Sequence, residues 1–315
     1  MNDEAAYYNQ INQDNVPRPE QLPRLHPMKT RILIVDGSPT AAQDGVVSMG
    51  GYRSGENYAA ALKSQAPGGG DAMDCFILAA GDGERLPQGM ALSDFHGVAW
   101  TGSPLSAYET TAVVNGQIEL ARSVFQSGVP CFGSCWGLQV MTVALGGRVH
   151  LNPKGYEVGI ARQIRVNADG RRHPMFDGKA DVFDAACTHQ DEVCELPPGA
   201  RLLAGNSYSE VQAAEVVDEE RSFWGVQYHP EFDLRQIAAI YRRRAARLVS
   251  DGLAVAESDI ESLADDYVAL MQNPERRDLA WRYGLGVDVL DPMIHRREFA
   301  NWLAVKVAPR VASGG

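Results

Sequence analysis

The sequence lacks a hydrophobic run long enough to span a bilayer, which takes roughly 20 successive apolar residues. Its first 27 residues are polar and contain prolines, without the basic and apolar blocks of a signal peptide. It also lacks an excess of positive charge, since 29 Lys and Arg stand against 40 Asp and Glu, a net charge of -11. We therefore expect a cytoplasmic protein that has neither a membrane nor a nucleic acid as its partner.

Cysteine is scarce as well, and its five copies form an odd number without disulfide-framework spacing. Cys131 and Cys135 have no matching Cys or His pair downstream, so a zinc site is not expected. The sequence shows no P-loop or other synthetase domain. We expect reduced thiols and neither a metal nor a cofactor.

One basic cluster departs from the acidic balance: Arg242, Arg243 and Arg244, followed by Arg247. The cluster falls in a helical pattern that starts at Asp233 and runs to about Ser250. A helix rich in arginine in an acidic protein is typical of a solvent-exposed face. The sequence therefore predicts a solvated helix surface here rather than a binding site.

The order of apolar segments predicts one doubly wound α/β domain with a mostly parallel sheet, added antiparallel strands and C-terminal helices. Buried strands are expected at 31–37, from 74, at 97–104 and before residue 133, and short alternating segments between 148 and 226 are typical of antiparallel strands. We expect a polar N-terminal extension (1–29), a catalytic domain (30–252) and a helical C-terminal extension (253–315).

The most informative segment is Gly133-Ser134-Cys135-Trp136-Gly137, which lies between an apolar strand and a helix. A nucleophile on such a turn needs small neighbours, because the backbone is strained and crowded. The helix N-terminus favours a thiolate, and the backbone N–H of Trp136 is placed to stabilise an oxyanion. Cys135 is therefore a candidate nucleophile, although most free cysteines are buried core residues.

A second candidate segment is Tyr228-His229-Pro230-Glu231, at the end of an apolar stretch. A histidine followed two residues later by a carboxylate can act as a base held by its orienting partner. Strand geometry is expected to put both side chains on one side, with Pro230 fixing the bend between them. Parallel strands end at one edge of a sheet, so His229 is expected near Cys135.

With both segments in place, residues 31–249 resemble the class I, triad-type glutamine amidotransferases and their γ-glutamyl hydrolase relatives. The resemblance rests on GSCWGLQ, GVQYHPEF, TGSPLSAYE (101–109), NPKGYEVG (152–159) and THQDEV (188–193), in the family's order. It implies a catalytic triad of Cys135, His229 and Glu231 that cleaves a γ-glutamyl amide through a thioester. The other implied contacts are oxyanion donors at the backbone of Ser103 and Trp136, and substrate-binding positions at Gly102, Gln139, His189 and Gln190.

Two departures from the family pattern bear on the pocket. Trp136 and Leu138 replace smaller or different residues, which predicts a pocket of altered shape, and residues 50–56 are expected to form a cleft wall or lid. For Glu157 and Asp191, anchoring of loops and contact with substrate remain equal alternatives.

Two uses of the triad stay open, a free-standing hydrolase of γ-glutamyl amides and an ammonia-supplying subunit of a separate synthetase. A third function, a non-catalytic regulator, would not use the triad. The aromatic residues of 279–291 and 297–305 could form a homo-oligomer interface or pack on the chain's own domain.

Overall fold

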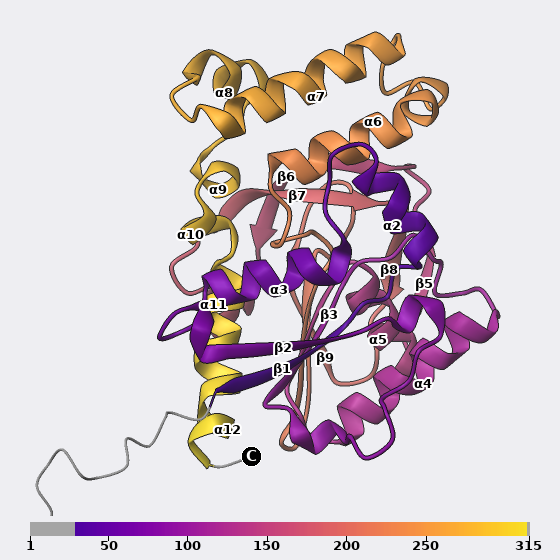
Figure 1. The fold of residues 1–315 in the computed structure, drawn as a ribbon, viewed down its shortest axis with the longest axis vertical. Coiled ribbons are helices and arrows are strands. Elements are labelled where there is room, and N and C mark those ends of the chain that lie inside the picture. Colours follow the sequence, from indigo (N-terminus) through magenta and orange to yellow (C-terminus); the bar gives the residue numbers. More distant parts are fainter. Residues whose placement is uncertain (1–28, 314–315) are drawn as a thin grey trace, which may run out of the picture.

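The computed structural model describes residues 29–313. Its main feature is a nine-stranded sheet of order β2-β1-β3-β4-β11-β10-β9-β6-β7, beside a two-stranded sheet of β5 and β8 (Figure 1). The strands are β1 (Thr30–Val35), β2 (Met73–Leu78), β3 (Gly97–Trp100), β4 (Cys131–Ser134), β5 (Arg148–Leu151), β6 (Glu157–Val166), β7 (Val182–His189), β8 (Asp191–Glu195), β9 (Ala200–Gly205), β10 (Ala213–Asp218) and β11 (Arg221–Val226).

The helices are α2 (Thr40–Val47), α3 (Ser54–Ser64), α4 (Ala112–Gln126), α5 (Trp136–Ala144), α6 (Leu234–Ser250), α7 (Glu257–Gln272), α8 (Arg277–Tyr283), α9 (Val287–Leu290), α10 (Pro292–His295), α11 (Arg297–Trp302), a π-helical segment (Leu303–Val307) and α12 (Ala308–Ser313). None of these described helices is both long enough and apolar enough to cross a membrane. The expected extension at 1–29 lies almost entirely outside the described residues.

The five strands β2, β1, β3, β4 and β11 are mutually parallel, whereas β10, β9, β6 and β7 continue the sheet antiparallel. This confirms the predicted parallel core with added antiparallel strands. The strands of the core are hydrophobic because both faces of the sheet are covered. Along β1, Ile32 and Ile34 point into one core and Leu33 and Val35 into the other.

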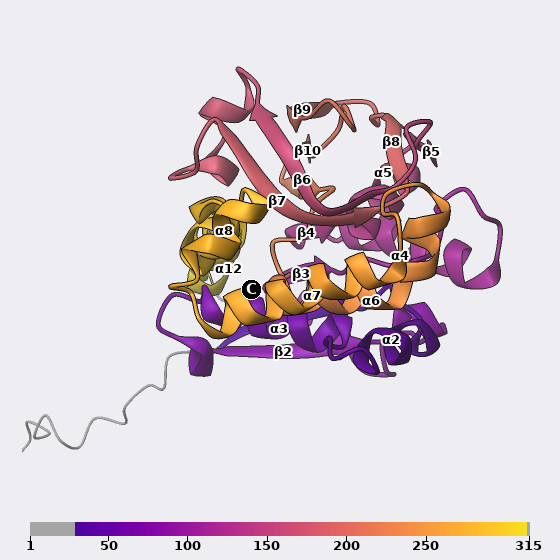
Figure 2. The ribbon, with the colours of Figure 1, turned by 90° about the horizontal axis from the view of Figure 1, so that it is seen from above.

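The two cores define the layers of the molecule. One face of the sheet is covered by α3 and by the C-terminal segment that contains Phe299 and Trp302. The other face is covered by α4 and α5. A third cluster joins α6 to α7 and α8, and these helices lie beside one another across one end of the sheet (Figures 1 and 2). The helices on both faces confirm the doubly wound arrangement.

The C-terminal segment packs on the chain's own domain. Phe299 contacts the rings of Tyr58 and Phe132, each at 5.1 Å between centroids, and Trp302 lies 6.0 Å from Phe132. Phe299 and Trp302 are fully buried. Of the two uses considered for the aromatic residues of 297–305, burial against the domain is therefore the one observed, while Trp281 of α8 stays 87% exposed.

Candidate active site

The turn between β4 and α5 carries Cys135 in a strained conformation, with φ 50° and ψ -99°. The residues two positions before and two positions after Cys135 must be glycine. A Cβ on Gly133 would lie 2.6 Å from the carbonyl carbon of Gly137, and one on Gly137 would lie 2.9 Å from Trp100. The backbone N–H of Cys135 donates to the carbonyl of Val226 at 2.7 Å, which fixes the turn to β11. The structure thus agrees with the crowding argument made from the glycine frame.

His229 and Glu231 lie together beside this turn. Nδ1 of His229 donates to Oε1 of Glu231 at 2.7 Å, and both side chains are buried. The imidazole stacks on Phe232 with 3.9 Å between ring centroids and an interplanar angle of 3°. A Cβ on Gly102 would come within 2.6 Å of Cε1 of His229, so the ring packs directly on this glycine.

The route by which His229 and Glu231 meet differs from the expected one. β11 ends at Val226, and both residues belong to a turn closed by the N–H of Phe232 donating to the carbonyl of His229 at 3.1 Å. Pro230 has no N–H with which to continue a strand ladder. The two side chains meet and Pro230 lies in the bend between them, as predicted, but the strand geometry expected to align them is not observed, because both residues lie in a turn after β11.

Only one of the two ring nitrogens of His229, Nδ1, is bonded to another residue of the described chain. Its Nε2 is buried and has no hydrogen-bond partner among the described residues, while Nδ1 is engaged by Glu231. Burial opposes the charged form of His229, but attraction by Glu231 and interaction with the Cys135 side chain outweigh it and raise the pKa of His229 to about 10. These interactions favour the protonated form of His229 at neutral pH.

Two neighbouring elements hold this cluster. In α3, the side-chain amide of Asn57 donates to the carbonyl of Glu231 at 2.9 Å, and the hydroxyl of Tyr58 bonds that of Ser134 at 2.8 Å. In α11, Glu298 accepts from the hydroxyl of Tyr228 at 2.5 Å. Each residue next to the nucleophile or the histidine is thus tied to a packed helix.

Cys135 lies where two cavities meet. The first, of about 110 Å³, is called here the head cavity. It is lined by Ser103, Pro104, Leu105, Ser106, Cys135, Gln139, Tyr156, Thr188, His189, Gln190, Asp191 and Arg244. The sequence-predicted residues Ser103, Gln139, His189 and Gln190 are therefore brought together with Cys135.

The second cavity, of about 90 Å³, is called here the amine-side cavity and lies on the side of His229. It is lined by Ser38, Ala42, Gln43, Val46, Tyr52, Ser54, Gly102, Ser103, Pro104, Cys135, Thr188, His229, Glu231, Phe232, Gln236, Ile240, Arg243 and Arg244. Tyr52 and Ser54 place residues 50–56 in its wall, as the sequence suggested. Tyr52 is held there because its N–H donates to Oε1 of Gln236 at 2.7 Å.

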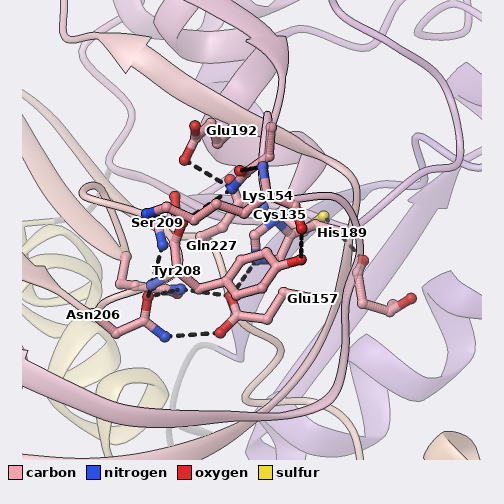
Figure 3. A network of polar contacts seen from close by, with 12 residues as sticks. Cys135, Lys154, Glu157, His189, Glu192, Asn206, Tyr208, Ser209 and Gln227 are labelled. Carbon is pink, nitrogen blue, oxygen red and sulfur yellow. Dashed lines mark hydrogen bonds and ion pairs between the residues drawn. The ribbon is translucent and has the colours of Figure 1, made fainter. Parts of the chain in front are cut away.

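Both ring nitrogens of His189 form hydrogen bonds within the protein. Nε2 bonds Oε2 of Glu157 at 2.7 Å, and Nδ1 bonds the carbonyl of Asp191 at 3.0 Å. Glu157 also accepts hydrogen bonds from Asn206 and Gln212, and Figure 3 shows this network beside Cys135. Of the two alternatives for Glu157, anchoring of loops is the one its contacts support, and any contact of His189 with substrate falls to its backbone.

Trp136 and Leu138, which were expected to alter the shape of the pocket, line neither cavity. The indole of Trp136 points into the core, where Nε1 donates to Oε1 of Gln117 at 2.8 Å, and Leu138 packs against Gly225. Neither side chain lines a cavity, because both positions of α5 face the sheet rather than the cleft. The altered pocket shape predicted from these two residues is therefore not seen.

The arginine-rich helix α6 is the main feature that the sequence reasoning missed. Gln236, Ile240, Arg243 and Arg244 line the amine-side cavity, so this part of the predicted solvated face borders the site. The spacing of Gln236, Ile240 and Arg243 places them on one helix face, and that periodicity was a usable signal. No cluster of three or more potential metal ligands occurs within residues 29–313.

Comparisons with known proteins agree with this geometry. A family model described as glutamine amidotransferase class-I matches residues 83–246. A protein of Pseudomonas sp. named gamma-glutamyl-L-1-hydroxyisopropylamide hydrolase is 31% identical over 284 residues, which cover 89% of this chain and 94% of that relative. The glutamine-hydrolyzing GMP synthase of Bordetella avium is 34% identical over 165 residues, but these cover 51% of this chain and only 28% of the synthase.

Solved structures show the same fold. A glutamine amidotransferase of Thermotoga maritima superimposes with a TM-score of 0.57 at 17% identity, over 85% of this chain and 98% of the other. A glutamine amidotransferase of Methylobacillus flagellatus gives a TM-score of 0.53 at 19% identity, over 91% of this chain and 95% of the other.

Proposed function

The chain belongs to the class-I glutamine amidotransferase family, and we propose that it hydrolyses γ-glutamyl amides whose nitrogen carries a small organic substituent. In this proposal the proton of the Cys135 thiol passes to Nε2 of His229, and the resulting thiolate attacks the side-chain carbonyl carbon of the γ-glutamyl group. The backbone N–H groups of Ser103 and Trp136 stabilise the oxyanion. The imidazolium of His229 donates its proton to the leaving nitrogen, the C–N bond breaks, and the amine departs from a γ-glutamyl thioester.

Water then completes the reaction. Neutral His229 accepts a proton from the water that attacks the thioester carbon, the C–S bond breaks, and glutamate leaves. The proton returns the cysteine and histidine to their starting state. Glu231 keeps Nδ1 protonated throughout, because an ionised carboxylate can only accept a hydrogen bond.

The observation that carries the proposal is the cavity on the side of His229. The leaving nitrogen must face the imidazolium that protonates it, so its substituent extends into the amine-side cavity. The volume of about 90 Å³ has room for several water molecules, since one needs about 10–15 Å³ on the same measure. Ammonia has no substituent to fill this space, whereas a small amine does. The hydroxyisopropyl group in the name of the Pseudomonas relative is a substituent of that size.

The second candidate function is a glutaminase that supplies ammonia to a separate synthetase. The similarity to GMP synthases favours it, since those relatives are named as glutamine-hydrolyzing. Under this alternative the enzyme prefers unsubstituted glutamine or needs a partner chain for turnover.

Glutamate release by the purified protein separates the two functions. We expect kcat/KM for γ-glutamyl-L-1-hydroxyisopropylamide to exceed that for glutamine by roughly 10- to 50-fold, because burial of each CH₂ group stabilises the complex by about 0.8 kcal/mol. The proposal would be contradicted if glutamine were hydrolysed equally well, or if turnover appeared only when a synthetase was added.

A cavity-filling variant locates the effect. Ala42→Leu adds bulk to the amine-side cavity and should lower kcat/KM for the substituted amide while sparing glutamine. Ala246→Leu, at an exposed position of α6, is the matched control and should change neither constant. Equal loss for both substrates in Ala42→Leu would mean that the amine does not occupy this cavity.

A further inference from the structure

Four of the five arginines of α6, all except Arg235, divide into two pairs. Arg242 forms ion pairs with α7, to Glu261 at 2.8 Å and Asp265 at 2.5 Å, and Arg247 pairs with Asp251 of its own helix end at 2.7 Å. Arg243 and Arg244 form no ion pair with any residue between 29 and 313 and instead line the cavities at Cys135. A guanidinium remains charged at any physiological pH. Two guanidinium groups therefore line the site without a carboxylate partner among the described residues, so each can bind an anionic group of a ligand.

Arg244 is the one that lines both cavities, where they meet at Cys135. Its guanidinium carbon lies 4.9 Å from the ring centroid of Tyr156, a cation–π contact that fixes the side chain. The hydroxyl of Tyr156 bonds that of Thr188 at 2.6 Å, and the carbonyl of Thr188 accepts from the Cys135 thiol at 3.8 Å. This chain of contacts holds the guanidinium at a defined place relative to the sulfur.

The head cavity holds one carboxylate as well. Asp191 is buried, lines this cavity, and accepts a hydrogen bond from the hydroxyl of Tyr108 at 3.1 Å. No ion pair joins Asp191 to Arg244 within the described part of the chain. The ring of His189 is bonded on both nitrogens. The cavity thus presents one guanidinium and one carboxylate that do not neutralise each other.

A γ-glutamyl group has the matching pair of charges, because its α-carbon bears an ammonium and a carboxylate. Resting on the function proposed above, we propose that Arg244 binds the α-carboxylate and Asp191 the α-ammonium of the γ-glutamyl substrate. The planar guanidinium suits a carboxylate because it can donate two parallel hydrogen bonds. The pair selects the zwitterionic head and sets the distance from it to the carbonyl that Cys135 attacks.

Substrates that lack one charge test each contact. γ-Glutamyl-ethylamide is compared with N-ethyl-4-aminobutanamide, which lacks the α-carboxylate, and with N-ethylglutaramate, which lacks the α-ammonium. We expect Arg244→Gln to raise KM for γ-glutamyl-ethylamide roughly 10- to 100-fold, the range for a hydrogen bond between charged groups. The same change should alter kcat/KM for the carboxylate-free amide by less than about threefold.

Two further variants sharpen the assignment. Asp191→Asn should show the converse pattern, with a loss confined to substrates that carry the α-ammonium. Arg244→Lys should recover only part of the affinity, since it keeps the charge but not the planar fork. Arg247→Gln, on the same helix but lining neither cavity, is the control and should leave all constants unchanged. A loss in Arg244→Gln that is equal for all three amides would overturn the proposal.

Failure of this inference can be told apart from failure of the proposed function. Calorimetry on Cys135→Ala measures binding of L-glutamate and of 4-aminobutanoate without any turnover. L-Glutamate binding that Arg244→Gln weakens more than tenfold would uphold the charge recognition even if wild-type protein hydrolysed no amide. If Arg244→Gln instead affected γ-glutamylglycine far more than γ-glutamyl-ethylamide, Arg244 would serve the amine side and the assignment would be wrong.

Discussion

Gly102 gives the sharpest single-atom test of the site. A Cβ at this position would lie 2.6 Å from Cε1 of His229, where ordinary contacts begin at about 3.4 Å. Gly102→Ala therefore forces the imidazole to move by roughly 0.8 Å unless the loop gives way. Phe232, stacked on the ring at 3.9 Å, and Glu231, bonded to Nδ1 at 2.7 Å, limit where the ring can go.

A displacement near 1 Å of a group that transfers a proton costs about 100-fold in rate. We expect Gly102→Ala to lower kcat for γ-glutamyl amide hydrolysis by about that factor, while overpacking lowers the free energy of unfolding by about 1–3 kcal/mol. Single-turnover kinetics with a γ-glutamyl amide measures the chemical step, and urea unfolding measures the stability.

The same substitution elsewhere provides the control. Gly116 lies within α4, and a Cβ there would meet no atom within 4 Å. Gly116→Ala should leave kcat unchanged and stabilise the helix by up to about 1 kcal/mol. A kcat for Gly102→Ala within threefold of wild type, at normal stability, would refute the view that contact with Gly102 positions His229.

Three other predictions follow from the site and its supports. Cys135→Ala should lower amide hydrolysis by more than about 1000-fold with an unchanged circular dichroism spectrum, because only the nucleophile is removed; residual turnover near wild type would exclude this thiol. The pKa of His229, raised to about 10 from its usual 6.5, means that its proton is lost only as pH rises through about 10. A pH profile of kcat/KM should therefore stay level to about pH 9, and Glu231→Gln should move the alkaline fall toward neutral pH; a wild-type fall near pH 7 would contradict this. Glu298→Ala leaves buried Lys179 without its partner and should cost about 3–5 kcal/mol in urea unfolding, part of which Lys179→Met in the same protein restores; an unchanged unfolding midpoint for Glu298→Ala would contradict it.

The parallel core and the neighbourhood of the triad were predictable for a local reason. Long apolar strands ending in Gly, Ser or Pro can only belong to a covered parallel sheet, and their ends share one edge. That placed Cys135 near His229 without any knowledge of loops. The bend at Pro230 was also predictable from its proline, whereas the end of β11 at Val226 was not, because a strand that ends three residues early has the same apolar pattern as one that continues.

The periodicity of α6 shows which of its residues share a face, but not what that face contacts. Whether an arginine on this helix contacts solvent, a carboxylate or a cavity depends on the position of α7. In this structure Glu261 and Asp265 of α7 form ion pairs with Arg242. That pairing spans about 20 residues and requires the turn between the helices to have a particular length. The division of Arg242 from Arg243 and Arg244 follows from tertiary packing, not from the pattern of either helix.

The segment after residue 252 shows how a region outside the matched family model can still support the chemistry. Phe299 and Trp302 fill the core beneath β4, which ends in Ser134 beside the nucleophile. Glu298 holds both Lys179 and the hydroxyl of Tyr228, the residue before His229. Without this segment the domain would expose the rings that Phe299 covers and leave a buried ammonium unpaired. The predicted boundary at residue 252 therefore does not mark a structural boundary. Residues before it and residues after it both pack against the strand and the turn that carry the triad.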